Sequence, residues 1–142
     1  MSEKVLLVDD EKEFLEIMSE RMTARGMEVT TVESADQALT ILGKKTFDAI
    51  VMDFQMPGMD GMEALKAIKN LKPELQIILL TGYATVEKTV EAMKVGATDF
   101  LEKPADLEAL SEKIKNAKTE KMLIVEKQME EKIKNILQRH GG

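Results

Sequence analysis

Short apolar runs recur along the chain, and polar residues follow each of them. Continuous apolar runs of this length are typical of parallel strands that are buried on both faces. The runs and the polar residues that follow them are 5–8 with Asp9 and Asp10, 50–52 with Asp53, 76–80 with Thr81, and 99–101 with Glu102 and Lys103. Residues 28–32 form a further short strand in this interpretation, so the pattern predicts five strands.

Apolar residues at helical spacing fill the segments between these strands. The spacing predicts a helix over residues 12–25, with Gly26 as its left-handed C-terminal cap. Ser34 with Gln37 three residues later is a capping box, which opens a helix that ends near Gly43. The other helices are predicted from Met62, Leu65 and Ile68, from Thr85 as the N-cap before Val86, Val90 and Met93, and from Asp106 as the cap before Leu107.

Strand and helix alternate five times with short connections, which predicts an α/β fold with a parallel sheet covered by helices on both faces. We expect the flavodoxin-like, doubly wound strand order 2-1-3-4-5, whose ligand crevice lies between strands one and three. This order would bring Asp9, Asp10 and Asp53 together.

Composition narrows the chemistry that this fold can carry. The 142 residues include no cysteine, so zinc–thiolate sites and cysteine nucleophiles are excluded. The net charge is -6, and the acidic residues are concentrated in residues 1–104, which disfavours a general nucleic-acid surface. The opening residues match neither a secretory signal nor a membrane span, so we expect a soluble cytoplasmic protein without direct contact to nucleic acid or membrane.

Four strand ends converge on one edge of the predicted sheet. They carry Asp9, Asp10, Asp53, Thr81 and Lys103. Taken alone, an Asp after a strand often only begins a turn. Three neighbouring carboxylates repel one another, however, and a hard divalent cation such as Mg²⁺ relieves that repulsion.

The same set of residues suits phosphoryl transfer. A carboxylate such as Asp53 is already ionised at neutral pH and can attack phosphorus, which gives an aspartyl phosphate. Lys103 and the Thr81 hydroxyl would each bind one phosphoryl oxygen. The residues therefore predict a magnesium-dependent phosphoryl-accepting site.

Four motifs in order resemble the receiver domain of two-component response regulators. They are LLVDDE (6–11), VMDFQMPGMDG (51–61), LTGYA (80–84) and FLEKP (100–104), and the last two resemble receivers of the nitrogen-regulator type most closely. The resemblance covers residues 4 to about 118. It implies that Asp53 accepts phosphate from a sensor histidine kinase, and that Thr81 and Lys103 bind the phosphoryl group.

The resemblance also implies a ligand set and a switch. Mg²⁺ would be bound by Asp10, Asp53 and the Gln55 backbone carbonyl, and by Asp9 through a water molecule. Thr81 and Phe100 would turn inward on phosphorylation and reshape the face formed by helix four, strand five and helix five. Tyr83 and Gln55 hold positions where family members vary and tune dephosphorylation, and Lys103–Pro104 is cis in many relatives.

The C-terminal residues predict a helix that is longer than a receiver needs. Residues 105–139 contain neither Pro nor Gly. The apolar residues from Met122 to Ile136 keep a 3-4 spacing that is shifted in phase from that of Leu107 to Ala117, while Lys121 and Gln128 interrupt the first pattern. A short coiled coil with a stutter, or an amphipathic helix packed on a partner, would explain this. We therefore divide the chain into a receiver, 1–118, and a helical extension, 119–142.

Two functions of different classes remain open at this stage. The first is a signalling switch without enzymatic activity beyond its own phosphorylation and dephosphorylation. The second is a Mg²⁺-dependent phosphohydrolase with an aspartyl-phosphate intermediate, although such enzymes place a DxDx pattern on strand one. A homodimer could form through helix four, strand five and helix five or through the C-terminal helix, the downstream partner is unknown, and both a stand-alone receiver and a longer regulator fit the sequence.

Overall fold

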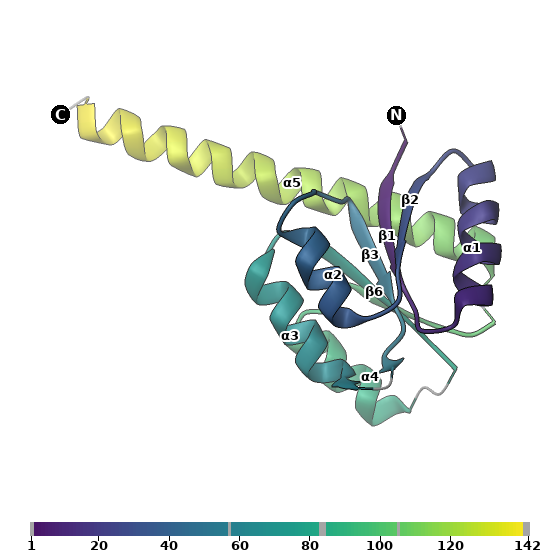
Figure 1. The fold of residues 1–142 in the computed structure, drawn as a ribbon. Helices are drawn as coiled ribbons and strands as arrows, with labels where there is room; N and C mark the ends of the chain where they lie inside the picture. The colour runs from purple at the N-terminus through teal and green to yellow at the C-terminus, as the bar shows by residue number, and fades with distance from the viewer. Residues whose placement is uncertain (1, 57, 83–84, 105, 141–142) are drawn as a thin grey trace.

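The computed structural model describes residues 2–56, 58–82, 85–104 and 106–140. Five parallel strands form its central sheet (Figure 1). They are β1 (Lys4–Val8), β2 (Glu28–Val32), β3 (Ala49–Met52), β6 (Gln76–Thr81) and β7 (Asp99–Glu102). Their order, β2-β1-β3-β6-β7, is the predicted flavodoxin-like order, which is thereby confirmed.

Helices cover both faces of the sheet (Figure 1). They are α1 (Lys12–Ala24), α2 (Ala35–Leu42), α3 (Gly61–Leu71), α4 (Val86–Val95) and α5 (Leu107–His140). α1 and α5 pack on one face, and α2, α3 and α4 pack on the other. Because successive strand side chains point to opposite faces, Leu6 and Leu7 enter different core layers, which explains the continuous apolar runs.

Local features of the sequence mark the end of α1 and the start of α2. The Gly26 φ is +88°, in the left-handed region that the predicted cap of α1 requires. At the start of α2, the Gln37 amide donates to Ser34 Oγ at 3.1 Å, which confirms the N-cap. The returning bond of the capping box runs from the Glu33 amide to Gln37 Oε1 at 2.8 Å, one residue earlier than in the standard motif.

The segment after Asp53 is more regular than the irregular turn expected from its Pro and Gly residues. Two short antiparallel strands, β4 (Gln55–Met56) and β5 (Met59–Asp60), form a separate hairpin. Gly58, with a φ of +90°, turns the chain between them. Gly61 then opens α3, where a Cβ atom would collide with the carbonyl oxygen of Phe54. The glycines therefore fold this segment tightly against the end of β3.

Helix α4 buries less of its surface than its apolar spacing suggests. Val86 is 82% exposed, and Val90 and Met93 are also exposed. Among the described residues of α4, Ala92 alone is buried. The spacing predicted the helix correctly, but most of the apolar stripe faces away from the core.

Helix α5 changes character along its length. Leu110, Ile114 and Ala117 are buried against the sheet. The ammonium groups of Lys118 and Lys121 donate to the carbonyl oxygens of Ser2 and Phe47 at 3.4 and 2.6 Å. Beyond this attachment the helix extends past the body of the molecule (Figure 1). No helix in the described part of the chain is long and apolar enough to cross a membrane.

Candidate phosphoryl-accepting site

The sheet itself brings the predicted site residues to one edge. The Asp9 amide donates to the carbonyl of Val32 at 3.2 Å, and the Asp53 amide donates to the carbonyl of Val8 at 3.0 Å. These bonds continue the parallel ladders one residue past the strands. Asp9 and Asp53 therefore lie side by side at the carboxyl ends of β1 and β3, where open α/β sheets bind ligands.

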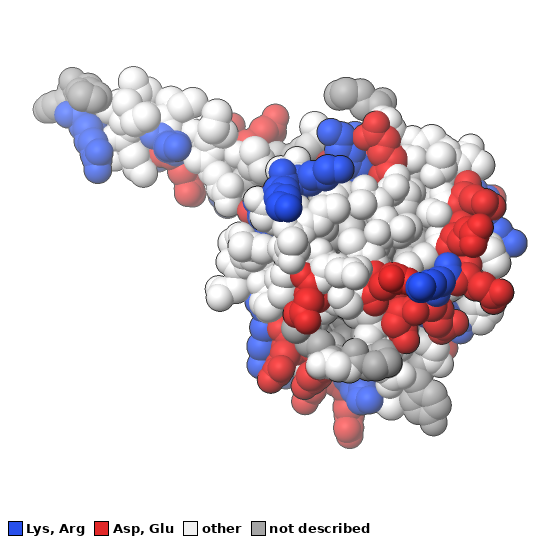
Figure 2. All heavy atoms as spheres, in the orientation of Figure 1, with Lys and Arg blue, Asp and Glu red and all other residues white. Residues whose placement is uncertain are grey.

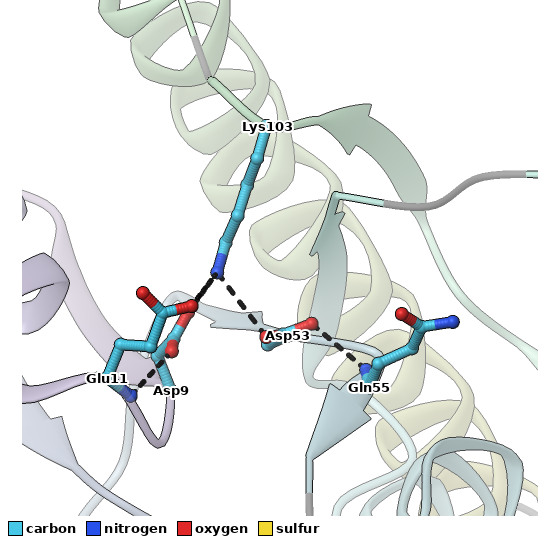
Figure 3. Close-up of polar contacts among 5 residues, drawn as sticks. All are labelled: Asp9, Glu11, Asp53, Gln55 and Lys103. Carbon is cyan, nitrogen blue, oxygen red and sulfur yellow. Dashed lines mark hydrogen bonds and ion pairs between the residues drawn. The ribbon is translucent and has the colours of Figure 1, made fainter.

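The two carboxylates are buried and oriented by backbone donors. Asp9 is 1% exposed and Asp53 is 7% exposed. Asp9 Oδ1 accepts a hydrogen bond from the Glu11 amide, and Asp53 Oδ1 accepts one from the Gln55 amide, each at 2.9 Å (Figure 3). Each bond runs two residues forward, as in an Asx-turn. Both side chains are thus fixed by the loop that follows their own strand.

Lys103 joins the two carboxylates. Its ammonium group lies 2.6 Å from Asp9 Oδ2 and 3.3 Å from Asp53 Oδ2 (Figure 3). The Lys103 amide also donates to the carbonyl of Thr81 at 2.8 Å, which anchors the residue to the end of β6. Burial disfavours the charged ammonium, but the bonds to Asp9 and Asp53 outweigh it and raise the pKa of Lys103.

The surroundings of Asp53 shift its protonation equilibrium. Burial raises the pKa of Asp53 above its ordinary value of 3.8. The Gln55 amide and the Lys103 charge oppose that rise, while the neighbouring Asp9 adds to it. The site therefore holds Asp53 at an electrostatic cost that another cation would reduce.

The donor set fits a hard divalent cation. Asp9, Asp10 and Asp53 each offer a carboxylate oxygen, and these oxygens lie within 4.8 Å of one another. Mg²⁺ prefers a small number of carboxylates and retains water molecules in its shell. Asp10 is exposed, so the cluster is open to solvent on that side. The acidic side chains over α1 and the carboxyl ends of the strands extend this negative region across the surface (Figure 2).

The remaining described residues of the predicted site come from three further strands. Thr81 ends β6 and is fully buried. Gln55 begins β4 directly beside Asp53. Phe100 lies half-buried in β7 and packs on the core layer that α2, α3 and α4 cover. The Lys103–Pro104 peptide is cis, and Tyr83 lies outside the described residues.

Two contacts of Lys103 were not anticipated from the sequence. Glu11 Oε1 lies 3.9 Å from the ammonium group, and the Phe14 ring centroid lies 4.2 Å from it. Phe14 is one of the apolar residues whose helical spacing predicts the helix over residues 12–25. Its position about one turn after Asp9 and Asp10, which follow β1, was the available signal, because α1 begins at the same edge of the sheet.

The fold and the clustered carboxylates define an α/β domain with an acidic site at the carboxyl ends of its strands, and sequence comparison gives its family. The chain belongs to the response regulator receiver domain family, whose pattern it matches over residues 5–115. It is 41% identical over 110 residues to the response regulator protein FleR of Pseudomonas aeruginosa, and this match covers 78% of the chain and 23% of FleR. The chain spans about a quarter of the length of such curated relatives.

Solved structures agree. A response regulator receiver domain protein from Clostridium thermocellum has a TM-score of 0.81 and 33% identity, covering 87% of this chain and 99% of that one. The beryllofluoride-activated NtrC4 receiver domain dimer has a TM-score of 0.78 and 34% identity, covering 83% and 98%. The chain is therefore a phosphorylation-controlled switch of two-component signalling. The receiver family interacts with sensor histidine kinases. The phosphohydrolase alternative is not favoured.

Proposed function

We propose that Asp53 is the residue of this receiver that accepts the phosphoryl group from a sensor histidine kinase. The observation that carries the proposal is the Lys103 ammonium, which lies between the buried carboxylates of Asp9 and Asp53 at 2.6 and 3.3 Å. A cation held there is placed to bind a phosphoryl oxygen once phosphorus is attached to Asp53. Asp53 directly follows the central strand of the sheet, at the strand's carboxyl end.

The transfer itself needs no general base. A carboxylate oxygen of Asp53 forms a bond to phosphorus while the P–N bond of the kinase phosphohistidine breaks, and the electron pair of that bond stays on the imidazole, which takes up a proton. Lys103 binds one phosphoryl oxygen, and the Thr81 hydroxyl donates to another. The bond from the Gln55 amide keeps the Asp53 carboxylate oriented during the attack.

We assign Mg²⁺ to the acidic cluster. Asp10, Asp53 and the Gln55 backbone carbonyl would bind it directly, and Asp9 would bind it through water. Bound there, Mg²⁺ supplies positive charge that offsets the charge of the carboxylates and of the phosphoryl group.

The output of the switch is proposed to be the face of α4, β7 and α5. Phosphorylation would draw Thr81 and Phe100 inward, because the Thr81 hydroxyl then follows the phosphoryl oxygen. The exposed Val86, Val90 and Met93 support this assignment, since they give α4 an apolar surface that a partner can cover. Apart from its own phosphorylation and dephosphorylation, the receiver catalyses no reaction in this proposal.

The phosphorylation proposal is tested by intact mass measurement. We expect the chain to gain one phosphoryl group on incubation with acetyl phosphate and Mg²⁺, and we expect Asp53→Asn to gain none. The Asp60→Asn variant is the matched control, because Asp60 is an exposed carboxylate at the N-cap of α3, and it should be modified like the parent. Modification that survives Asp53→Asn would refute the assignment.

For the helical extension, residues 119–142, we propose parallel pairing with the extension of a second copy. Its stripe consists of Met122, Val125, Met129, Ile133 and Ile136, each between 41% and 56% exposed. The 3-4-4-3 spacing of the stripe keeps these side chains on one side of the helix, which fits a coiled coil with a stutter.

The receiver part, residues 1–118, would remain a separate folding unit in the cytoplasm, where the ATP used by histidine kinases is found.

Charges beside the stripe favour the parallel orientation. At 3.6 residues per turn, Glu126 and Glu130 flank one side of the stripe, and Lys132 and Arg139 flank the other. In a parallel pair, the two different flanks face each other across the seam, so acids meet bases. In an antiparallel pair, like flanks meet, and the acids repel.

The chain offers a clean test of this pairing because it contains no cysteine. Ile136→Cys, near one end of the stripe, should form a disulfide-linked dimer on mild oxidation, since equivalent stripe positions adjoin in a parallel pair, whereas an antiparallel pair would place position 136 against position 122 of the partner, about 21 Å away. Lys127→Cys, on the far side of the helix, is the control and should not cross-link. Sedimentation showing a monomer at high concentration, with and without acetyl phosphate, would overturn the dimer, whereas a dimer without the Ile136→Cys link would overturn the parallel orientation.

A further inference from the structure

The ring of Phe14 contacts the Lys103 ammonium, which lies among the carboxylates of the site. The ring centroid lies 4.2 Å from the Lys103 ammonium nitrogen, well within the range of a cation–π contact. Phe14 lies in the first turn of α1 and is half-buried against the core layer that α1 and α5 form on the sheet. The ring therefore belongs to the packed framework of the fold and contacts the site at the same time.

Lys103 needs such a fixed partner. A lysine side chain is a flexible four-carbon stem with a compact charge at its end. Here the backbone is fixed by the bond to Thr81, and the ammonium group has Asp9, Glu11 and Asp53 within 3.9 Å. Of these, the contact with Asp53 is the one that phosphorylation must change, since a phosphoryl oxygen then takes the place of the carboxylate as the partner of Lys103.

We propose that Phe14 is a positioning residue for phosphoryl transfer, which holds the Lys103 ammonium over the site through the face of its ring. This inference rests on the proposed role of Lys103 as a phosphoryl ligand. The ring contact involves no carboxylate, so it persists while the anionic partners of the ammonium are exchanged. Phe14 thereby restricts Lys103 to positions from which it reaches the incoming phosphoryl group.

Substitutions at position 14 should distinguish the effect of the aromatic ring face from the effect of apolar volume alone. Phe14→Leu keeps most of the core volume and should slow phosphorylation by acetyl phosphate by about three- to tenfold, the effect that loss of a partly desolvated cation–π contact would give. Phe14→Tyr should retain the parental rate. Phe47→Leu is the matched control, because it removes a buried ring from the opposite core layer without contacting Lys103, and its rate should be unchanged.

The sharpest series replaces Phe14 by monofluoro-, difluoro- and trifluorophenylalanine, which weaken the negative ring face with little change in size. We expect the rate to fall stepwise along this series. In the metal-free protein, the Hε protons of Lys103 should show a ring-current shift in NMR spectra that Phe14→Leu abolishes. That second readout reports the contact without any phosphorylation.

The outcomes distinguish this inference from the function on which it rests. A flat fluorination series, or Hε shifts that Phe14→Leu leaves unchanged, overturns the role of Phe14 if Lys103→Ala still impairs phosphorylation. If Lys103→Ala phosphorylates at the parental rate, the phosphoryl-binding role of Lys103 fails first, and that of Phe14 fails with it. A stepwise decline together with a lost Hε shift supports the proposal.

Discussion

Two regions of the molecule depart from the usual distribution of polar and apolar groups, in opposite directions. The site buries charge, with Asp9 and Asp53 almost inaccessible to solvent. The extension of α5 exposes apolar side chains, with Met129 and Ile133 more than half exposed. Its surface shows large uncharged areas between scattered charges (Figure 2).

The site and the extension differ in whether the groups that contact them belong to the same chain. Within the site, the partners belong to the same chain, because Lys103 and two backbone amides satisfy the buried carboxylates. In the extension, the described part of the chain packs nothing against the stripe, so in the proposed dimer its partner comes from a second copy. Changes in the site should therefore alter the stability of the monomer, and changes in the stripe should alter association alone.

The largest effect should follow removal of Lys103. Lys103→Met leaves Asp9 and Asp53 buried without their cation, and breaking a buried pair of this kind costs about 3–5 kcal/mol. Urea unfolding in metal-free buffer measures this loss. Lys113→Met, which breaks the more exposed pair with Asp99, is the control and should cost at most about 1 kcal/mol. Equal costs for the two variants would mean that burial does not distinguish the site.

A second pair of variants compares the two halves of α5. Ile114→Ala removes a fully buried side chain and should cost about 2–5 kcal/mol in unfolding free energy. Ile133→Ala, in the stripe, should cost less than about 0.5 kcal/mol at concentrations where the chain is monomeric. A comparable loss for Ile133→Ala under those conditions would show that the stripe is packed within one chain.

Magnesium should stabilise the site and leave the extension unaffected. At ten times its Kd, Mg²⁺ should raise the unfolding free energy by about 1.4 kcal/mol, because it binds the folded state alone. Asp10→Asn removes one proposed ligand from an exposed position, so it should weaken this effect without destabilising the metal-free chain. Full Mg²⁺ stabilisation in that variant would remove Asp10 from the ligand set.

The smallest effect concerns the charge of Asp53. Because burial raises its folded pKa above 3.8, the folded chain holds this proton more tightly than the unfolded chain does. The ionised carboxylate therefore lowers stability as pH rises from about 3.8 through the folded pKa. We expect Asp53→Asn to melt above the parent at neutral pH and the difference to shrink below pH 4. A variant that melts below the parent at neutral pH would contradict this sign.

Much of this architecture could be predicted from the sequence. The continuous apolar runs gave the strands, since a parallel strand covered on both faces tolerates few polar residues. The acids that follow residues 8 and 52 predicted the position of the site, because the carboxyl ends of parallel strands lie at the same edge of the sheet. Helical spacing gave α4 but not the exposure of Val90 and Met93, since periodicity identifies a stripe and not what covers it.

Other features depend on contacts between distant residues. The β4–β5 hairpin forms around Gly58, although its strands are only two residues long, too short to show a period. The contact of Phe14 with Lys103 joins residues that are far apart in sequence, and the one local signal, the position of Phe14 about one turn after Asp10, does not identify Lys103 as its partner. Such contacts become visible only once the fold brings the side chain of Lys103, which follows β7, to Asp9 at the end of β1.

The central claim is that the phosphoryl group is carried by Asp53, and chemical mapping of the modified residue tests it most directly. Borohydride reduces an acyl phosphate to an alcohol with loss of phosphate, so a phosphorylated aspartate becomes homoserine, which peptide mass spectrometry locates. After treatment with acetyl phosphate and Mg²⁺, we predict homoserine at position 53. Homoserine at position 9, 10 or 60, with position 53 unmodified, would contradict the account.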